Sequence, residues 1–160
     1  MAGPEVSVGK HLGREVTKLD VEAQTAPQLA RDGLEHQAKH LLTVDILVEE
    51  SANHLKRISV RGTVAESQLM VARINEFDGL YFVPGGPLLC CIYEDRPGVI
   101  ATVSRHIADL GINIEDMRNP HDSKTGRSLV ILKLSQAIDA ETVAKVAADI
   151  DSESALCITL

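Results

Sequence analysis

A carboxylate and an amide that flank one apolar segment are the side chains best suited to bind a small ligand. Asp95 follows Tyr93 and precedes Arg96-Pro97-Gly98, and Asn113 lies in Gly111-Ile112-Asn113-Ile114. A carboxylate can accept from an amino group, an amide can bridge both ends of a ligand, and exposed helix N–H groups attract a carboxylate. The segment from Tyr93 to Ile114 has the pattern of a strand, a tight turn, a helix, a glycine and a second strand. This pattern leaves the polar groups at one edge of the segment. They suit a small zwitterion better than catalysis.

A simpler interpretation is that Asp95 merely precedes a helix that begins at Pro97 and Gly98. It explains the turn, but not Asn113, because Asn is disfavoured in a strand unless its amide has partners. If two chains pair edge to edge, Asn113 of one chain would face Tyr93 and Asp95 of the other. The candidate ligand-binding residues are Tyr93, Asp95, Arg96, Pro97, Gly98, Val99, Ile100 and Asn113.

Motifs for other chemistry are absent from the sequence. It contains no Walker loop, no CxxC and no HExxH, and the glycines of Val8-Gly9-Lys10-His11-Leu12-Gly13 have the wrong spacing for a dinucleotide site. His36 and His40 could share a helix face as metal ligands. No Cys or acidic residue at ligand spacing accompanies them convincingly, so a solvated face is the favoured interpretation. We expect no catalytic residue, metal or cofactor in this chain.

The composition is that of a globular protein with few aromatic residues. Of 160 residues, 44% are hydrophobic, 24% are charged and only 2% are aromatic. The core must therefore be built from Val, Ile, Leu and Ala, and thin cores of this kind often gain stability from oligomerisation. A net charge of -7 disfavours binding to nucleic acid or to an anionic membrane.

The cysteines and the hydropathy pattern indicate a cytoplasmic location. Cys90, Cys91 and Cys157 lie in apolar, strand-like runs, where a thiol usually serves as a small hydrophobic side chain. No signal-peptide pattern is present, and no apolar run approaches the roughly 18 residues of a membrane span.

The first half of the chain predicts a small mixed α/β domain over residues 17–84, preceded by a flexible lead-in over 1–16. Pro27 opens a predicted helix that continues to about His40. The segment Pro84-Gly85-Gly86-Pro87 can continue neither a helix nor a central strand, and it marks the predicted domain border. Alternating or apolar runs predict strands over 17–22, 42–48, 55–64, 68–75 and 80–83.

The second half, residues 88–160, predicts a second α+β domain. Gly111 is placed to end one helix in the left-handed conformation, and Asp139 is placed to cap the next. The element order is βαββαβ, a ferredoxin-like antiparallel sheet with two helices on one side. Strands are expected over 88–93, 112–117, 128–134 and 155–160, and helices over 97–110 and 139–150.

Residues 88–160 resemble an ACT domain, a βαββαβ module that binds amino acids between paired copies. The resemblance lies in Asp95-Arg96-Pro97-Gly98-Val99-Ile100 and Gly111-Ile112-Asn113-Ile114. It implies a homodimer or a larger assembly through sheet edges. In the family, serine is held by a Tyr or His, by an Asp or Asn, and by an Asn, at the positions of Tyr93, Asp95 and Asn113.

The preceding residues resemble the end of the allosteric-substrate-binding domain of long-type bacterial D-3-phosphoglycerate dehydrogenase. This resemblance rests on Arg61-Gly62-Thr63-Val64, Arg73-Ile74-Asn75 and Phe82 to Leu89, and more weakly on Thr25 to Gly33. It implies an anion or effector site, for which Lys56, Arg57 and Arg61 are candidates; a solvated strand face is at least as good an interpretation. The catalytic half of that family, with its NAD, is not present in this sequence.

Three functions remain open at this point. The first is a regulatory amino-acid-binding unit, with L-serine as the expected ligand, either as a region of a D-3-phosphoglycerate dehydrogenase or as a free-standing relative that acts on a catalytic chain. The second is the regulatory subunit of an iron-sulfur L-serine dehydratase, which pairs the same two domain types. The third is a structural dimerisation module without a ligand.

Overall fold

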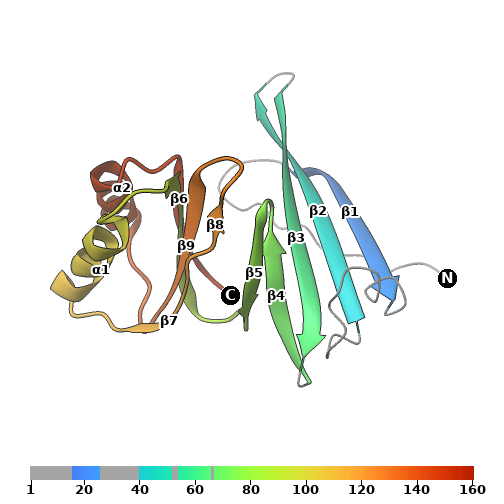
Figure 1. Cartoon of the computed structure of the whole chain (residues 1–160), viewed down its shortest axis with the longest axis horizontal. Helices are drawn as coiled ribbons and strands as arrows, with labels where there is room; N and C mark the ends of the chain where they lie inside the picture. Colours follow the sequence, from blue (N-terminus) through green and yellow to red (C-terminus); the bar gives the residue numbers. More distant parts are fainter. Residues whose placement is uncertain (1–15, 26–39, 52–53, 66) are drawn as a thin grey trace.

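The computed structural model describes residues 16–25, 40–51, 54–65 and 67–160, and these form two antiparallel sheets and two helices (Figure 1). The lead-in expected over residues 1–16 lies outside the described residues except for Val16, and so does the predicted helix except for His40, which begins a strand.

The first sheet is a meander in which each strand pairs with the next one along the chain. The strands predicted over 17–22, 42–48, 55–64 and 68–75 are all confirmed, with longer or slightly shifted bounds. The last strand begins at Phe77 instead of at Leu80. The strands are β1 (Val16–Thr25), β2 (His40–Ser51), β3 (His54–Ala65), β4 (Gln68–Ile74) and β5 (Phe77–Phe82).

The second sheet has the strand order β10-β6-β9-β7, and all of its pairs are antiparallel. The order is compatible with the predicted ferredoxin-like arrangement. A short additional strand, β8, pairs with β9 in the connection from β7. The elements are β6 (Pro87–Glu94), α1 (Val99–Asp109), β7 (Ile114–Arg118), β8 (His121–Asp122), β9 (Arg127–Leu134), α2 (Ala140–Asp149) and β10 (Ser154–Thr159).

The two helices lie within the predicted ranges, 97–110 and 139–150, and each is one or two residues shorter at its ends. Asp139 caps α2 by accepting a hydrogen bond from the Thr142 N–H at 2.7 Å. Gly111 follows α1 with φ +69°, and the N–H of Ile112 donates to Ile107 O at 3.2 Å. This is the left-handed stop that glycine adopts without steric cost.

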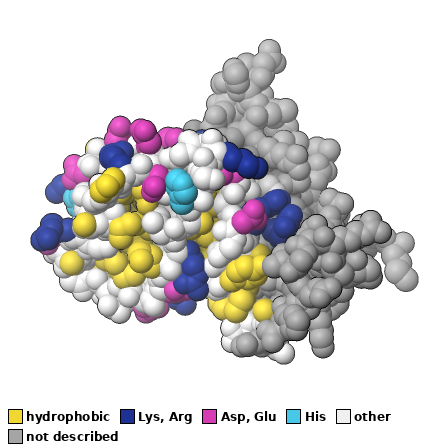
Figure 2. Space-filling view, in the orientation of Figure 1, with side chains coloured by type: hydrophobic (Ala, Val, Ile, Leu, Met, Phe, Trp, Pro, Cys, Tyr) yellow, Lys and Arg dark blue, Asp and Glu magenta, His cyan; other side chains and the backbone are white. Residues whose placement is uncertain are grey.

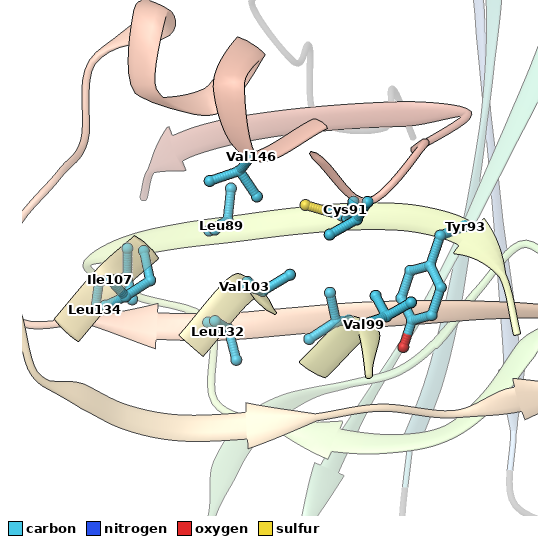
Figure 3. Close-up of a cluster of buried hydrophobic side chains, with 11 residues drawn as sticks. Leu89, Cys91, Tyr93, Val99, Val103, Ile107, Leu132, Leu134 and Val146 are labelled. Atoms are coloured by element: carbon cyan, nitrogen blue, oxygen red, sulfur yellow. The ribbon is translucent and has the colours of Figure 1, made fainter. Parts of the chain in front are cut away.

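A hydrophobic core lies between the helices and one face of the second sheet. Figure 3 shows its side chains directed into the space between the strands and the helices, with Tyr93 beside Val99 at one end of the cluster. The fully buried members are Leu89, Cys91, Tyr93, Val99, Val103, Ile107, Val130, Leu132, Leu134, Val146 and Ile150.

A second hydrophobic cluster lies on the opposite face of this sheet and joins it to the first sheet. In Figure 1, α1 and α2 lie on one side of β6 and β9, and β5 lies on the other. Alternate residues of β9 therefore contact different layers, so this strand is apolar on both faces. The members of this cluster, here called the intersheet layer, are Phe77, Leu80, Phe82, Leu88, Leu129 and Ile131.

The aromatic side chains are few but most of them are buried. The sequence has two Phe and two Tyr. Phe77, Phe82 and Tyr93 are each at most 6% exposed, whereas Tyr81 is 45% exposed. The expectation of a core built only from Val, Ile, Leu and Ala is therefore wrong, because the intersheet layer depends on Phe to fill the space between two sheets.

Candidate functional site

Asp95 lies in the turn between β6 and α1, where its backbone is tied to the opposite hairpin. Its N–H donates to Gly126 O at 2.9 Å. Its Oδ1 accepts from the Ser128 hydroxyl at 2.8 Å, and its Oδ2 lies 3.3 Å from His121 Nδ1. The Asp95 side chain remains 46% exposed. The carboxylate is therefore fixed in position while part of it stays open to a ligand.

Tyr93 lies in the buried core next to this turn. It lies one residue before the end of β6 and is 1% exposed, and its hydroxyl donates to Asn119 Oδ1 at 2.8 Å. Burial is the main reason why the pKa of Tyr93 is raised, and the nearby Asp95 carboxylate adds to this effect. The hydroxyl therefore stays protonated and serves as a hydrogen-bond donor at neutral pH.

The start of α1 lies directly after this turn and has no side-chain cap. Gly98 is the N-cap with φ +93°, a conformation that favours glycine, and a Cβ built on it would meet no atom within 4 Å. The first N–H groups of a helix lack intrahelical partners, and this end of the helix carries a partial positive charge. The space over Gly98 can therefore accept an anionic group.

Arg96 and the apolar candidates contribute to packing. Arg96 donates from its guanidinium to Ile150 O at 2.7 Å, at the end of α2, where a positive charge is favourable. Val99 is buried in the core and Ile100 is partly buried against it. We see no contact in the structure that gives these three side chains a role in binding.

Asn113 lies at the opposite end of the second sheet from Asp95. Its N–H donates to the Ser135 hydroxyl at 3.1 Å, its carbonyl accepts from the Ser135 N–H at 3.0 Å, and the residue is exposed. Asp95 instead contacts Ser128 at the start of β9. At about 3.3 Å per residue, the path from Ser128 to Ser135 is roughly 23 Å long. The expectation that one chain brings both groups to the same edge is therefore wrong.

The candidate anion site is described only in part. Arg57 pairs in register with Leu47, and Lys56 with Val48, whereas Arg61 lies between Thr43 and Arg73. The Nε atoms of Arg61 and Arg73 are buried and lack a hydrogen-bond partner among the described residues. An anion site at Lys56, Arg57 and Arg61 stays a prediction.

Three residues of the site were not expected from the sequence. Asn119, His121 and Ser128 come from the β7–β9 connection and the start of β9, and they surround Tyr93 and Asp95. The sequence gives a weak signal for Ser128, because antiparallel pairing of the predicted strands 88–93 and 128–134 places it beside Tyr93. Asn119 and His121 depend on the shape of a hairpin around Pro120, for which no pattern was available.

Two features of the described residues bear on metal and nucleic-acid binding. Among the residues that the structure describes, no group of three His, Cys, Asp or Glu side chains could hold a metal ion. Figure 2 shows acidic, basic and histidine side chains interspersed over the described part of one face, with no continuous basic patch. No described helix has the length and apolar character needed to cross a membrane.

Comparison with known proteins shows a partial similarity to a dehydrogenase. Over 91 residues the chain is 28% identical to the D-3-phosphoglycerate dehydrogenase of Methanocaldococcus jannaschii. The matched segment is 57% of this chain and 17% of that relative. The similarity supports a relation to this family and concerns only a part of the enzyme. No model of a known protein family matches the chain.

Proposed function

We propose that this chain is a regulatory region that binds a small amino acid, with L-serine as the expected ligand, between two copies of its second sheet. The observation that supports this most is the half-exposed Asp95 carboxylate beside the uncapped start of α1. The Asp95 carboxylate would accept hydrogen bonds from the ligand's ammonium group, and the helix N–H groups would donate hydrogen bonds to the ligand's carboxylate.

A second chain would complete the site by pairing at β7, which is a terminal strand of the second sheet. In antiparallel self-pairing about a two-fold axis, the start of one strand lies next to the end of its partner. Asn113 precedes the start of β7, and Asn119, bonded to Tyr93, follows its end. Asn113 of one chain would therefore lie close to Tyr93 and Asp95 of the other chain. The dimer would hold two equivalent ligand sites.

The similarity to a D-3-phosphoglycerate dehydrogenase agrees with the resemblance seen in the sequence, and it is this resemblance that implies serine as the ligand and an ACT domain as the module. In this proposal the catalytic reaction, with its NAD, belongs to another region or another chain in the cytoplasm. Ligand binding would stabilise the paired form and limit the motion of a catalytic partner, which is a coupling between two sites. No described contact favours the dehydratase subunit or the purely structural module over this function.

The proposal is tested by screening the common amino acids for thermal stabilisation, followed by isothermal titration with L-serine. A ligand that binds only the folded state raises its stability, and here it should also favour the dimer in analytical ultracentrifugation. Asn113→Ala should weaken L-serine binding by at least tenfold, because it removes an amide that contacts the ligand.

Gln136→Ala is the matched control, since Gln136 is an exposed amide in the turn after β9, near Asn113. This variant should bind as the wild type does. The proposal is wrong if no amino acid stabilises the protein, or if Asn113→Ala and Gln136→Ala bind L-serine equally well. A dimer that forms through β7 without any ligand response would instead support the structural module.

A further inference from the structure

We propose that the ligand's ammonium group replaces the imidazole of His121 at Asp95, so that amino-acid binding depends on the charge of this histidine. The inference rests on the proposed function, because it concerns the same site. Asp95 Oδ1 is occupied by the buried Ser128 hydroxyl. The other oxygen, Oδ2, lies 3.3 Å from His121 Nδ1, and the Asp95 side chain is 46% exposed. A ligand cation and the imidazole therefore compete for one oxygen.

The backbone keeps His121 close to this oxygen even when the side chain turns away. His121 pairs with Ser128 in the β8–β9 ladder. The preceding residue, Pro120, accepts a hydrogen bond from the Leu129 N–H at 3.1 Å. Since the His121 side chain is 46% exposed, it can rotate toward water but cannot move far from Asp95. A protonated ring would still repel an ammonium group at such a distance.

The other charged groups near His121 are engaged elsewhere. Asp122, on the same strand, accepts hydrogen bonds from the backbone of Lys124 and from Thr125. Arg127 on β9 pairs with Glu76 and with Glu153. The neutral Tyr93 hydroxyl donates to Asn119. Among the described residues, Asp95 is therefore the acidic side chain that pairs with His121.

A protonated imidazole should weaken binding, because it holds the carboxylate oxygen and repels the ammonium group. A histidine gains its positive charge as the pH falls. If the ligand binds only when the ring is neutral, the Kd for L-serine should rise several-fold as the pH is lowered from 7.5 to 5.5. Where part of the protein carries a protonated ring, binding should release a fraction of a proton to the buffer.

The test is isothermal titration of the full chain with L-serine from pH 5.5 to pH 8, in two buffers of different ionisation enthalpy. His121→Gln should bind L-serine with little dependence on pH, without proton release, and more tightly than the wild type at pH 5.5. His121→Lys keeps a positive charge throughout this range, so its binding should be weak at every pH.

His106→Gln is the matched control, because His106 forms a similar pair with Asp149, at 2.8 Å, between α1 and α2. It should retain the wild-type dependence on pH. The inference is overturned if the wild-type Kd is constant over this range, or if His121→Gln keeps the same dependence. Failure of L-serine to bind the wild type at any pH would show that the proposed serine site is wrong, and the inference would fail with it.

Discussion

Tyr93 and Asp95 have different tasks because β6 ends between them, at Glu94. Tyr93 faces the helices and is buried, so its hydroxyl needs a hydrogen-bond partner, which Asn119 provides. Asp95 lies beyond the end of β6 and stays half exposed, held by Ser128 and the Gly126 carbonyl. We therefore expect Asp95 to contact the ligand and Tyr93 to position the hairpin that carries His121.

The candidate residues could be found from the sequence, but their arrangement could not. Asn113 was recognisable because Asn is disfavoured in a strand, and Asp95 because its carboxylate follows Tyr93 directly before the expected helix. Their separation along β9 depends on the register of β7 against β9, in which Ile114 pairs with Leu134. Register is a property of the folded sheet, and a pattern of alternating residues does not specify it across the irregular hairpin over residues 119–126 that joins β7 to β9.

The two adjacent cysteines of β6 should make the protein less stable as the pH rises into the alkaline range. Burial raises the pKa of Cys90 and of Cys91 to about 12, and for Cys90 the neighbouring thiols Cys91 and Cys157 add to this effect. Unfolded thiols lose their protons near pH 9.0. Above that pH the unfolded state binds fewer protons than the folded state, so the free energy of unfolding falls as pH rises. The loss is at most about 1.4 kcal/mol per pH unit for each thiol.

The measurement is urea-induced unfolding between pH 8 and pH 10 for the wild type and for the variant with Cys90→Ala and Cys91→Ala. The variant should be less stable at pH 8, since it loses buried side-chain volume, but its stability should fall less steeply with pH. Tyr93 also has a raised pKa, and it lowers the stability at alkaline pH in the wild type and in the variant alike. The informative quantity is therefore the difference between the two proteins in the slope of the free energy of unfolding against pH. Equal slopes would contradict the prediction.

At the scale of the elements, α2 shows how one side chain defines a helix start. Asp139 accepts from the Thr142 N–H, and this backbone hydrogen bond is the main reason why the pKa of Asp139 is lowered from 3.8. A lowered pKa means that the carboxylate form stabilises the folded state. This contribution is present above the unfolded pKa and is lost as the pH falls through the folded value.

Asp139→Ala should therefore lower the thermal midpoint by a few degrees at pH 7, because it removes the N-cap. Asp139→Asn keeps a capping oxygen without the charge, so it should retain most of the stability at pH 7. The difference in stability between the wild type and Asp139→Asn should disappear as the pH falls through the lowered pKa of Asp139. Thermal unfolding followed by circular dichroism measures all three proteins. An Asp139→Ala variant as stable as the wild type at pH 7 would show that the cap contributes nothing.

Most strands could be predicted because one face is apolar, but β5 could not be predicted in full. Its sequence begins with Phe77-Asp78-Gly79, which is typical of a turn. In the structure Gly79 has φ +75° and Tyr81 has φ +40°, and the pairing with β4 is irregular between Val71 and Arg73. Side chains do not alternate regularly in a strand with two residues of positive φ. The two-residue period of apolar side chains that predicts a strand is therefore lost in β5.

At the scale of the whole molecule, the intersheet layer and two arginines connect the sheets. Arg118 at the end of β7 donates from Nε to Leu80 O at 2.7 Å and from its guanidinium to Tyr81 O at 3.3 Å. Arg127 pairs with Glu76, in the turn before β5, and with Glu153, in the turn before β10. Both arginines lie near the Asp95 end of the second sheet, so a movement there can be transmitted to the first sheet through these contacts.

The intersheet layer should make the two sheets unfold as one cooperative unit, and Phe77→Ala tests this. Phe77 is 1% exposed and lies in the cluster with Leu129 and Ile131 of β9. Removal of a buried Phe side chain leaves a cavity and typically costs about 3–5 kcal/mol. Amide hydrogen exchange should then show faster exchange in β9 of the second sheet as well as in β4 and β5. Leu69→Ala is the control, since Leu69 is 58% exposed on the same sheet as Phe77 and should change exchange in neither sheet. If Phe77→Ala accelerates exchange only in the first sheet, the second sheet is stable by itself, and its ligand site does not depend on the residues that precede Pro84.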